Sequence, residues 1–198
     1  MKKALLTLAA ICFAISFSSC CKPDKVGDVT VVLHAQETGN WCWLANTQMI
    51  HQFFGGIVAQ CDLANTRLGK DNCCNPEEDD GCPKTEDCNT AGNTKSAIES
   101  LGYTLVNNTS PLSWDALRKE IDCGRRPMVF GDGPSGDGVG HVRVIYGFAE
   151  VGGVRYLYLK DPAPFCDGDD YEITYEQYSN TAGPGRVHRK TFTKIKKS

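Results

Sequence analysis

The feature that most constrains this fold is the stretch 36–46, which places a cysteine where a loop turns into a helix. After Trp43, apolar residues recur at helical spacing for about three turns. They are Leu44, Met49, Ile50, Phe53 and Phe54. Gly55-Gly56 supplies a left-handed stop. Asn40 is the predicted N-cap, so Cys42 falls in the first turn. The helix dipole there favours a thiolate, the nucleophilic form of cysteine.

The same stretch carries a family resemblance. Gln36, Cys42 and Trp43 resemble the papain-like cysteine peptidases in residue type and spacing. The Trp41-Cys42-Trp43 form is similar to compact bacterial members, including effector peptidases that plant pathogens deliver into hosts. The resemblance implies that the Gln36 side chain and the Cys42 backbone N–H stabilise an oxyanion. Papain has a second cysteine at the position of Gly39, so the disulfide framework here must differ.

Two residues in the second half of the chain complete the predicted site. His141 follows a glycine-rich run and opens an apolar strand, and Gly140-His141-Val142 resembles the context of the papain-like base. Asp161 ends the partner strand of the predicted hairpin, which brings it back to the imidazole. We therefore predict that Cys42 is the nucleophile, His141 the general base and Asp161 the group that orients it, a place where papain has asparagine.

The walls of the predicted cleft are less defined. Trp43 and Gly140 are expected to contact substrate because they flank the nucleophile and the base. The glycine-rich run 131–138 is either a flexible connection or a movable rim over the groove.

The N-terminus is predicted to be a targeting segment. Lys2-Lys3 precede an apolar run, and Phe17-Ser18-Ser19-Cys20 resembles a bacterial lipobox. Residues 1–19 would be removed, Cys20 lipidated, and residues 20–28 would tether a peptidase domain at 29–198. A simple secretory signal is the alternative, and a membrane span is disfavoured because the run is shorter than ~20 residues. We expect a lipid-anchored protein of the bacterial cell envelope, periplasmic or on the outer surface, or a secreted one.

Eleven cysteines fit an oxidising compartment better than a reducing cytosol. With Cys12 removed, Cys20 lipidated and Cys42 catalytic, eight remain, and the sequence leaves their pairing open. They are Cys21, Cys61, Cys73, Cys74, Cys82, Cys88, Cys123 and Cys166. A zinc site within 73–88 is disfavoured, because the paired spacing of structural zinc sites is missing. The acidic run 77–80 likewise lacks calcium-loop spacing. No metal and no other cofactor is expected.

Length and patterning predict one α+β domain. The 198 residues are 41% hydrophobic and 23% charged, which is ordinary for a soluble globular protein. Helices are predicted first, at 44–54, 62–68, 94–100 and 114–121. Strands are predicted at 29–33, 128–130, 142–149, 154–159 and 187–195. A helical N-terminal half packed on a C-terminal antiparallel sheet agrees with the papain-like fold. Basic residues are scattered, so no nucleic-acid partner is expected, and we expect a monomer.

The leading functional prediction is an extracytoplasmic cysteine peptidase that hydrolyses protein or peptide substrates through a thioester. A cell-wall peptide amidase or endopeptidase with the same chemistry is the enzymatic alternative, disfavoured by the long spacing between Cys42 and His141. A binding lipoprotein on a retired peptidase scaffold is disfavoured because all four expected positions hold competent residues. A disulfide-rich adhesin would explain the cysteines but would leave those four positions as coincidence.

Overall fold

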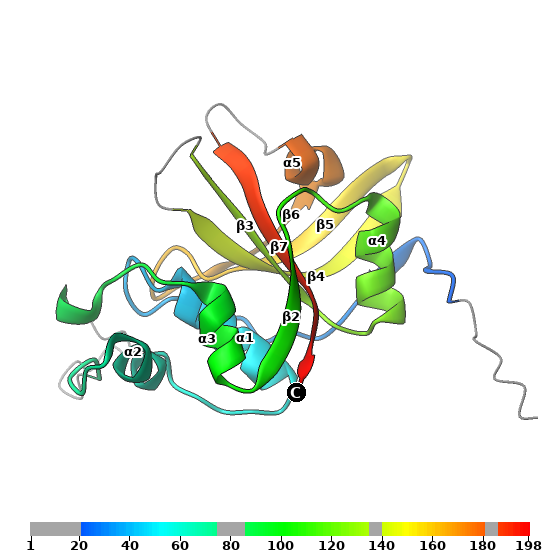
Figure 1. Cartoon of the computed structure of the whole chain (residues 1–198). Coiled ribbons are helices and arrows are strands. Elements are labelled where there is room, and N and C mark those ends of the chain that lie inside the picture. The colour runs from blue at the N-terminus through cyan, green and yellow to red at the C-terminus, as the bar shows by residue number, and fades with distance from the viewer. Residues whose placement is uncertain (1–20, 75–85, 135–139, 181–185) are drawn as a thin grey trace, which may run out of the picture.

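The computed structural model describes residues 21–74, 86–134, 140–180 and 186–198. It shows an antiparallel sheet with helices on both faces, and α1, α2 and α3 gather together at one side of it (Figure 1). The predicted α+β class is confirmed. The N-terminal signal at 1–19, the lipidation site Cys20 and the acidic run 77–80 lie outside the described residues.

The first helices follow the predicted pattern. They are α1 (Cys42–Phe53), α2 (Gln60–Leu68), the 3₁₀ turn η1 (Glu86–Cys88) and α3 (Thr94–Ser100). Gly55 and Gly69 stop α1 and α2 in the left-handed region, with φ of 81° and 66°. The Asn93 side chain caps α3 by accepting from Ser96 N. Cys42 is the first residue of α1, so its predicted place in the first turn is confirmed.

The later helices are shorter. They are α4 (Trp114–Arg118), its π-helical continuation η2 (Lys119–Cys123) and α5 (Tyr175–Asn180). Ser113 caps α4, accepting from Ala116 N, and Gly124 ends η2. Helix α5 was not predicted, because six residues are too few for an apolar period to show.

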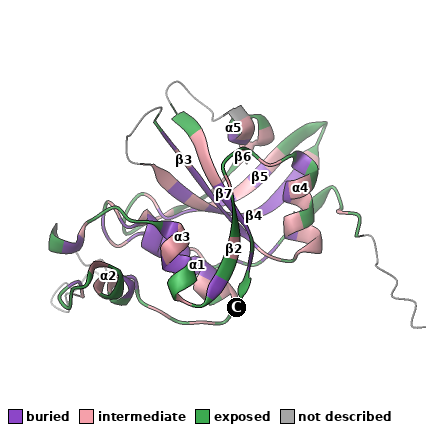
Figure 2. Ribbon diagram, in the orientation of Figure 1, coloured by how far each residue is buried: buried purple, intermediate pink, exposed green. Residues whose placement is uncertain are grey.

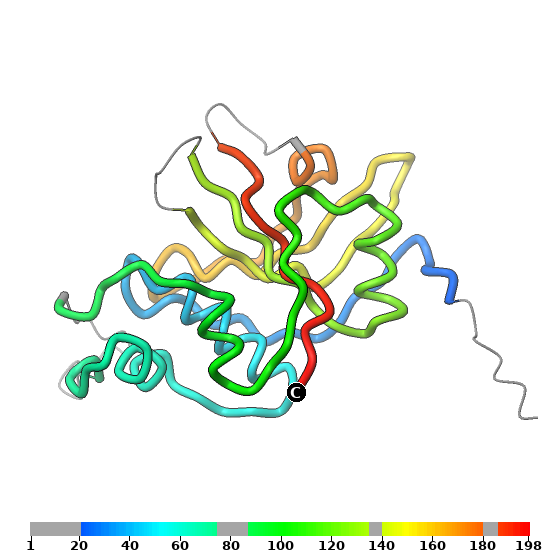
Figure 3. Tube along the Cα trace, in the orientation of Figure 1, coloured from blue at the N-terminus to red at the C-terminus, as the bar shows by residue number. Residues whose placement is uncertain are grey.

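Within the described residues, the sheet has seven strands. They are β1 (Val26–Asp28), β2 (Tyr103–Asn108), β3 (Met128–Pro134), β4 (His141–Val151), β5 (Val154–Asp161), β6 (Asp169–Thr174) and β7 (Arg186–Lys197). The order is β2-β7-β3-β4-β5-β6, with β1 added on β4. Strand β7 runs between β2 and β3 (Figure 3). Gly152 and Gly153 turn β4 into β5 with positive φ, which confirms the predicted hairpin.

One strand prediction is wrong, and two strands were not predicted. Residues 29–33 form no strand, because the pairing with β4 is made by Val26–Asp28 instead. Strands β2 and β6 were not predicted. β2 has one buried residue, Tyr103, and β6 alternates apolar and polar residues only over its last four positions, so neither pattern is long enough to stand out in the sequence.

The segment 20–28 is not a free tether where the structure describes it. Cys21 forms a disulfide with Cys123 of η2. Arg118 Nε donates to Asp24 O at 3.0 Å, and Glu150 N donates to Lys25 O at 2.8 Å. These contacts hold the described residues of this segment against η2, α4 and β4. In the described part of the chain, no helix has the length and apolar content to span a membrane.

Both faces of the sheet bury apolar side chains. Neighbouring residues Met128 and Val129 point into different clusters. One cluster packs Met49 and Ile50 of α1 against the sheet. The other packs α4 and α5 on the opposite face. The burial pattern is visible in Figure 2, and each fully buried large side chain is worth ~1.5–3 kcal/mol. The face that carries α1 is the one that holds the nucleophile.

Candidate active site

Cys42 is held at the start of α1 by the two tryptophans beside it. Trp41 is fully buried and donates its indole N–H to Cys88 O at 2.7 Å. Trp43 donates its indole N–H to Thr90 O at 3.0 Å. Among the residues that the structure describes, Cys42 carries the free thiol, and it is partly buried. The nucleophile helix is therefore fastened to the segment 88–90.

Asn89 fastens the loop before Cys42 to the same segment. Its side-chain oxygen accepts from Asn40 N at 2.8 Å and from Thr38 Oγ1 at 2.9 Å. Asn40 Nδ2 in turn donates to Asn89 O at 3.1 Å. The predicted N-cap role of Asn40 is thus wrong: Trp41 is the cap residue, with no side-chain cap, and the Asn40 amide is used for this clamp.

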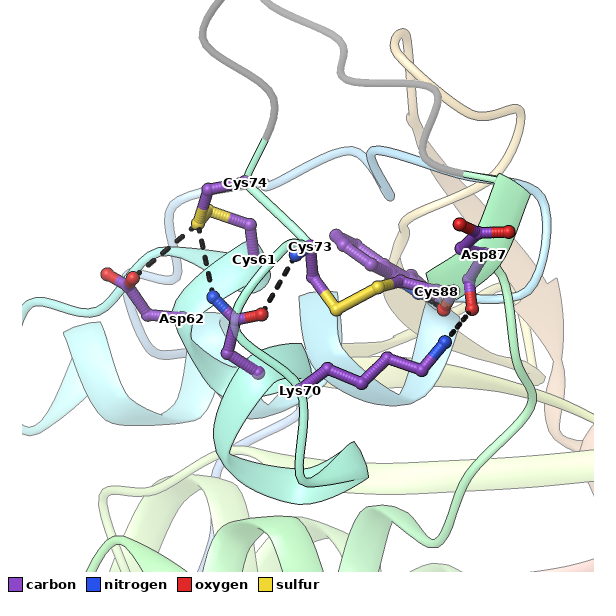
Figure 4. Close-up of a disulfide and its surroundings, with 9 residues drawn as sticks. Cys61, Asp62, Lys70, Cys73, Cys74, Asp87 and Cys88 are labelled. Carbon is purple, nitrogen blue, oxygen red and sulfur yellow. Dashed lines mark hydrogen bonds between the residues drawn. A yellow bond between two sulfur atoms is a disulfide. The ribbon is translucent and has the colours of Figure 1, made fainter.

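Two disulfides lie beside the segment 88–90, and one of them is bonded directly to its first residue, Cys88. Cys73 bonds Cys88 and Cys61 bonds Cys74 (Figure 4). Both sulfurs of the first pair are in fully buried residues next to Trp41. In the described residues, the grouping that could hold a metal is Cys61, Asp62 and Cys74, and its two sulfurs are joined in a disulfide. The preference for disulfides over zinc is confirmed for Cys73, Cys74 and Cys88. Cys166 is also disulfide-bonded.

His141 meets Cys42 and Asp161 at once. Its Nε2 lies 2.5 Å from Asp161 Oδ1, and its ring also hydrogen-bonds Cys42. Since Nε2 serves Asp161, Nδ1 is the nitrogen available to Cys42. Burial lowers the pKa of His141, but the hydrogen bonds with Asp161 and Cys42 outweigh this and raise it to about 9. The imidazolium form is therefore favoured near neutral pH.

Asp161 is buried and accepts four hydrogen bonds. Oδ1 accepts from His141 Nε2 and from Ala163 N, the latter at 2.9 Å. Oδ2 takes Arg143 Nε at 2.7 Å and Tyr171 Oη at 3.0 Å. Burial raises the pKa of Asp161, but its hydrogen bond and charge attraction to His141 and the charge of Arg143 bring it down to about 2. The carboxylate stays ionised and fixes the imidazole ring.

A chain of charges continues behind Asp161. Arg143 Nη1 donates to Asp132 Oδ1 at 3.0 Å, and Arg186 donates to both oxygens of Asp132. The pKa of Asp132 is lowered: burial raises it, but the hydrogen bonds and charges of Arg186 and Arg143 outweigh burial. Arg143 is largely buried between the two carboxylates and holds both.

Gln36 lies near the site but its amide is occupied. Its Nε2 donates to Thr38 O at 3.0 Å and to Gly39 O at 2.7 Å. Its buried Oε1 has no partner among the described residues. Gln36 N donates to Pro162 O at 2.8 Å, which places Gln36 beside the end of β5. Both amide hydrogens thus stabilise the loop before Cys42 in this conformation.

A cavity of about 340 Å³ opens over the cysteine and the histidine. The residues predicted to contact substrate, Trp43 and Gly140, both line it. Its other lining residues are Gly39, Asn40, Cys42, Ala91, Gly92, Thr94, Asp132, His141, Val142, Arg189 and Lys190. Of the predicted rim 131–138, residues 131–134 belong to β3, and 135–139 lie outside the described residues.

Sequence patterns missed several of these residues. Asn89 lies in a cysteine-rich loop with no signal of its own, and nothing near Arg143 in the sequence marks it as a buried charge. Arg189 and Lys190 reach the cavity through a strand irregularity. Asp132 lies between two glycines, a composition typical of turns, so its neighbours do not mark it as a buried charge.

Comparison with known proteins gives a family match. Residues 25–181 match a family model described as papain-like cysteine protease AvrRpt2. A crystal structure of a double glycine motif protease from an AMS/PCAT transporter, in complex with the leader peptide, is 20% identical. The match covers 84% of this chain and 94% of that chain, with a TM-score of 0.49. The peptidase domain of Streptococcus ComA, a bifunctional ABC transporter involved in quorum sensing, is 15% identical. That match covers 81% of this chain and 96% of that chain, with a TM-score of 0.47. A search of curated proteins gave no match.

Proposed function

The chain belongs to the family described as papain-like cysteine protease AvrRpt2, and from this membership we propose that it hydrolyses peptide bonds through Cys42, His141 and Asp161. From its N-terminal sequence we propose that it does so outside the cytoplasm. The observation that carries the proposal is the position of His141, which hydrogen-bonds Cys42 on one side and Asp161 on the other. A free thiol, a base and a buried carboxylate in this order are the parts that acyl transfer needs.

The mechanism follows from these contacts. His141 takes the proton of Cys42, and the resulting imidazolium is stabilised by the ionised Asp161. The thiolate attacks the peptide carbonyl and forms a tetrahedral oxyanion. His141 then protonates the leaving amine, and water hydrolyses the thioester. Asp161 keeps Nε2 occupied, so Nδ1 stays directed at the sulfur throughout.

Two donors are proposed for the oxyanion. The backbone N–H of Cys42 lies at the first position of α1, where helix N–H groups have no partner within the helix. The Gln36 amide is the second, and it must release Thr38 O or Gly39 O to serve. One such donor is commonly worth ~3–4 kcal/mol of transition-state stabilisation.

The location is proposed from the sequence. Residues 1–19 would act as a lipoprotein signal and Cys20 would carry the lipid. The disulfides support an oxidising compartment, since thiols in the cytosol are kept reduced. Replacing Cys20 with serine should move the protein from the membrane fraction to the soluble envelope or medium. Retention in the membrane fraction would contradict the anchor.

Peptide cleavage tests the activity. A peptide library is incubated with the purified protein and with Cys42→Ala, and the products are identified by mass. We expect the substitution to reduce cleavage by at least about 10³-fold. An epoxide-type thiol reagent should modify Cys42 in the wild type. Equal cleavage by both proteins, or an unreactive Cys42, would exclude the proposal.

A further inference from the structure

The cavity over Cys42 receives two consecutive basic residues from β7. Successive side chains of a strand normally point to opposite faces. Here the pairing of β3 and β7 shifts: Gly131 pairs with Lys190, whereas Asp132 pairs with His188. Arg189 is the extra residue of this bulge. A bulge redirects side chains, so both Arg189 and Lys190 line the cavity.

Glycines in β3 let the two side chains cross that strand. A Cβ on Gly131 would lie 3.0 Å from Lys190 Cγ and 3.1 Å from Lys190 Cε. A Cβ on Gly133 would lie 2.6 Å from Arg189 Nε. The side chains of Lys190 and Arg189 therefore occupy the space that a side chain at position 131 or 133 would fill. They lead from β7 across β3 toward β4, the strand that begins with His141.

Lys190 carries a charge that the described residues do not neutralise. It is half-buried, and no described carboxylate pairs with it; its ammonium lies 5.6 Å from the Phe192 ring. Burial lowers the pKa of Lys190, while Cys42 raises it and Arg189 lowers it. The one acidic residue in the described cavity lining, Asp132, is already bound by Arg143 and Arg186.

Partial burial of an ammonium without an anion is costly, and an anionic ligand would offset that cost. Once the proton of Cys42 has passed to His141, the two groups together carry no net charge, so they do not supply the missing anion. Arg189 adds a second positive charge to the same wall and donates to Pro134 O at 2.8 Å.

We propose that Lys190, with Arg189 beside it, forms a subsite for a carboxylate of the peptide substrate. This inference rests on the peptidase function proposed above and specifies its substrate class. The carboxylate is either the side chain of an aspartate or glutamate close to the scissile bond, or the C-terminus of a short peptide. Both present the same group to Lys190, and the experiment separates them.

Matched peptides give the first test. Glu or Gln is placed in turn at each position from three residues before to three residues after the scissile bond. Every peptide is made with a C-terminal acid and with a C-terminal amide. Wild type should cleave the peptide with the carboxylate about tenfold faster in kcat/KM at one position. Lys190→Met should reduce this ratio to about one, and Lys190→Glu should reverse it, so that the uncharged peptide is cleaved faster. Lys196→Met removes the same charge from an exposed site of β7 outside the cavity and should keep the ratio.

Ionic strength provides an internal check, because screening weakens charge attraction. The preference should fall when salt is raised from 0.05 to about 0.5 M. A wild type that cleaves Glu and Gln peptides equally, and acid and amide termini equally, overturns the inference while leaving the peptidase proposal intact. A preference for the carboxylate peptide that persists in Lys190→Met also overturns the inference.

A second measurement does not need a substrate. Iodoacetate is an anion and iodoacetamide is neutral, and both alkylate thiolates. Both alkylation rates depend equally on the fraction of Cys42 that is thiolate. Their ratio is therefore independent of that fraction and depends on the charge around the sulfur. Lys190→Met should lower this ratio about threefold to tenfold, and Lys196→Met should not change it. An unchanged ratio in Lys190→Met contradicts the cationic subsite even if no peptide is cleaved.

Discussion

Asn40 and Asn89 are far apart in the sequence and hold each other by two hydrogen bonds. The backbone N–H of Asn40 donates to the Asn89 side chain at 2.8 Å, and the Asn40 side chain donates to the Asn89 backbone oxygen at 3.1 Å. The loop that leads into Cys42 is therefore shaped by a segment outside it.

Asn89→Ala should lower kcat/KM by about 10- to 100-fold, because Thr38 and Asn40 lose their shared acceptor. Two buried donors lose their partner, so the free energy of unfolding should also fall by about 1–3 kcal/mol. Asn89→Asp keeps the acceptor oxygen and should retain most of the activity. Steady-state kinetics and thermal unfolding of both variants check this. A fully active Asn89→Ala would show that the loop holds its shape unaided.

Loss of the Cys73–Cys88 disulfide should impair both stability and activity. The bond anchors the segment whose oxygens bind Trp41 and Trp43. The paired substitution Cys73→Ser with Cys88→Ser should cost about 2–4 kcal/mol of stability and reduce kcat/KM. Cys21→Ser with Cys123→Ser is the matched control. It also removes a disulfide but does not touch the cavity, so it should lower the melting temperature and leave kcat/KM near wild type.

The alkaline limb of the pH–activity profile should report His141. Its raised pKa predicts that kcat/KM falls as pH rises through about 9. Asp161→Asn removes the charge and one of the hydrogen bonds that raise this pKa, so the limb should move down toward the ordinary histidine range. A limb that does not respond to Asp161→Asn would mean that another group controls it.

The free energy of unfolding should fall at both high and low pH, because the pKa values of His141 and Asp161 change on folding. The pKa of His141 rises from 6.5 to about 9, so its stabilisation is complete below 6.5 and is lost as pH rises toward 9. The pKa of Asp161 falls from 3.8 to about 2, so its stabilisation is present above 3.8 and is lost as pH falls toward 2. Denaturant unfolding of wild type and His141→Gln should differ most between 3.8 and 6.5 and converge toward pH 9.

Arg143→Met should destabilise the fold by about 3 kcal/mol, because it leaves Asp132 and Asp161 without their shared partner. Arg143→Lys should rescue it only partly, since one ammonium does not reproduce the fork that reaches both carboxylates. Chemical unfolding measures the loss. A variant as stable as wild type would show that Tyr171 and Arg186 suffice to hold the two acids.

Local patterns were enough to predict the parts of the site that depend on short stretches of chain. The helical spacing after Trp43 places Cys42 at the start of α1. The glycines before His141 and at 152–153 define the hairpin that brings Asp161 back to the imidazole. These features are set by neighbours within about twenty residues, where periodicity and turn chemistry are informative.

Contacts between distant segments could not be predicted in the same way. The partners of Asn89 and Arg143 come from other elements, and nothing in their own neighbourhood signals them. The pairing of eight cysteines is undetermined by spacing alone. Lys190 reaches the cavity only because a bulge and a glycine coincide on two paired strands. The polar strands β2 and β6 are held by their neighbours and not by a pattern of their own.

The position of β7 inside the sheet has a consequence for how the fold is completed. It follows every other described strand in the chain, yet it joins β2 to β3. Without residues 186–197, β2 would have no strand to pair with in the described sheet, and the cavity would lack Arg189 and Lys190. The sheet and the cavity are thus complete only when this segment lies between two strands that precede it in the chain.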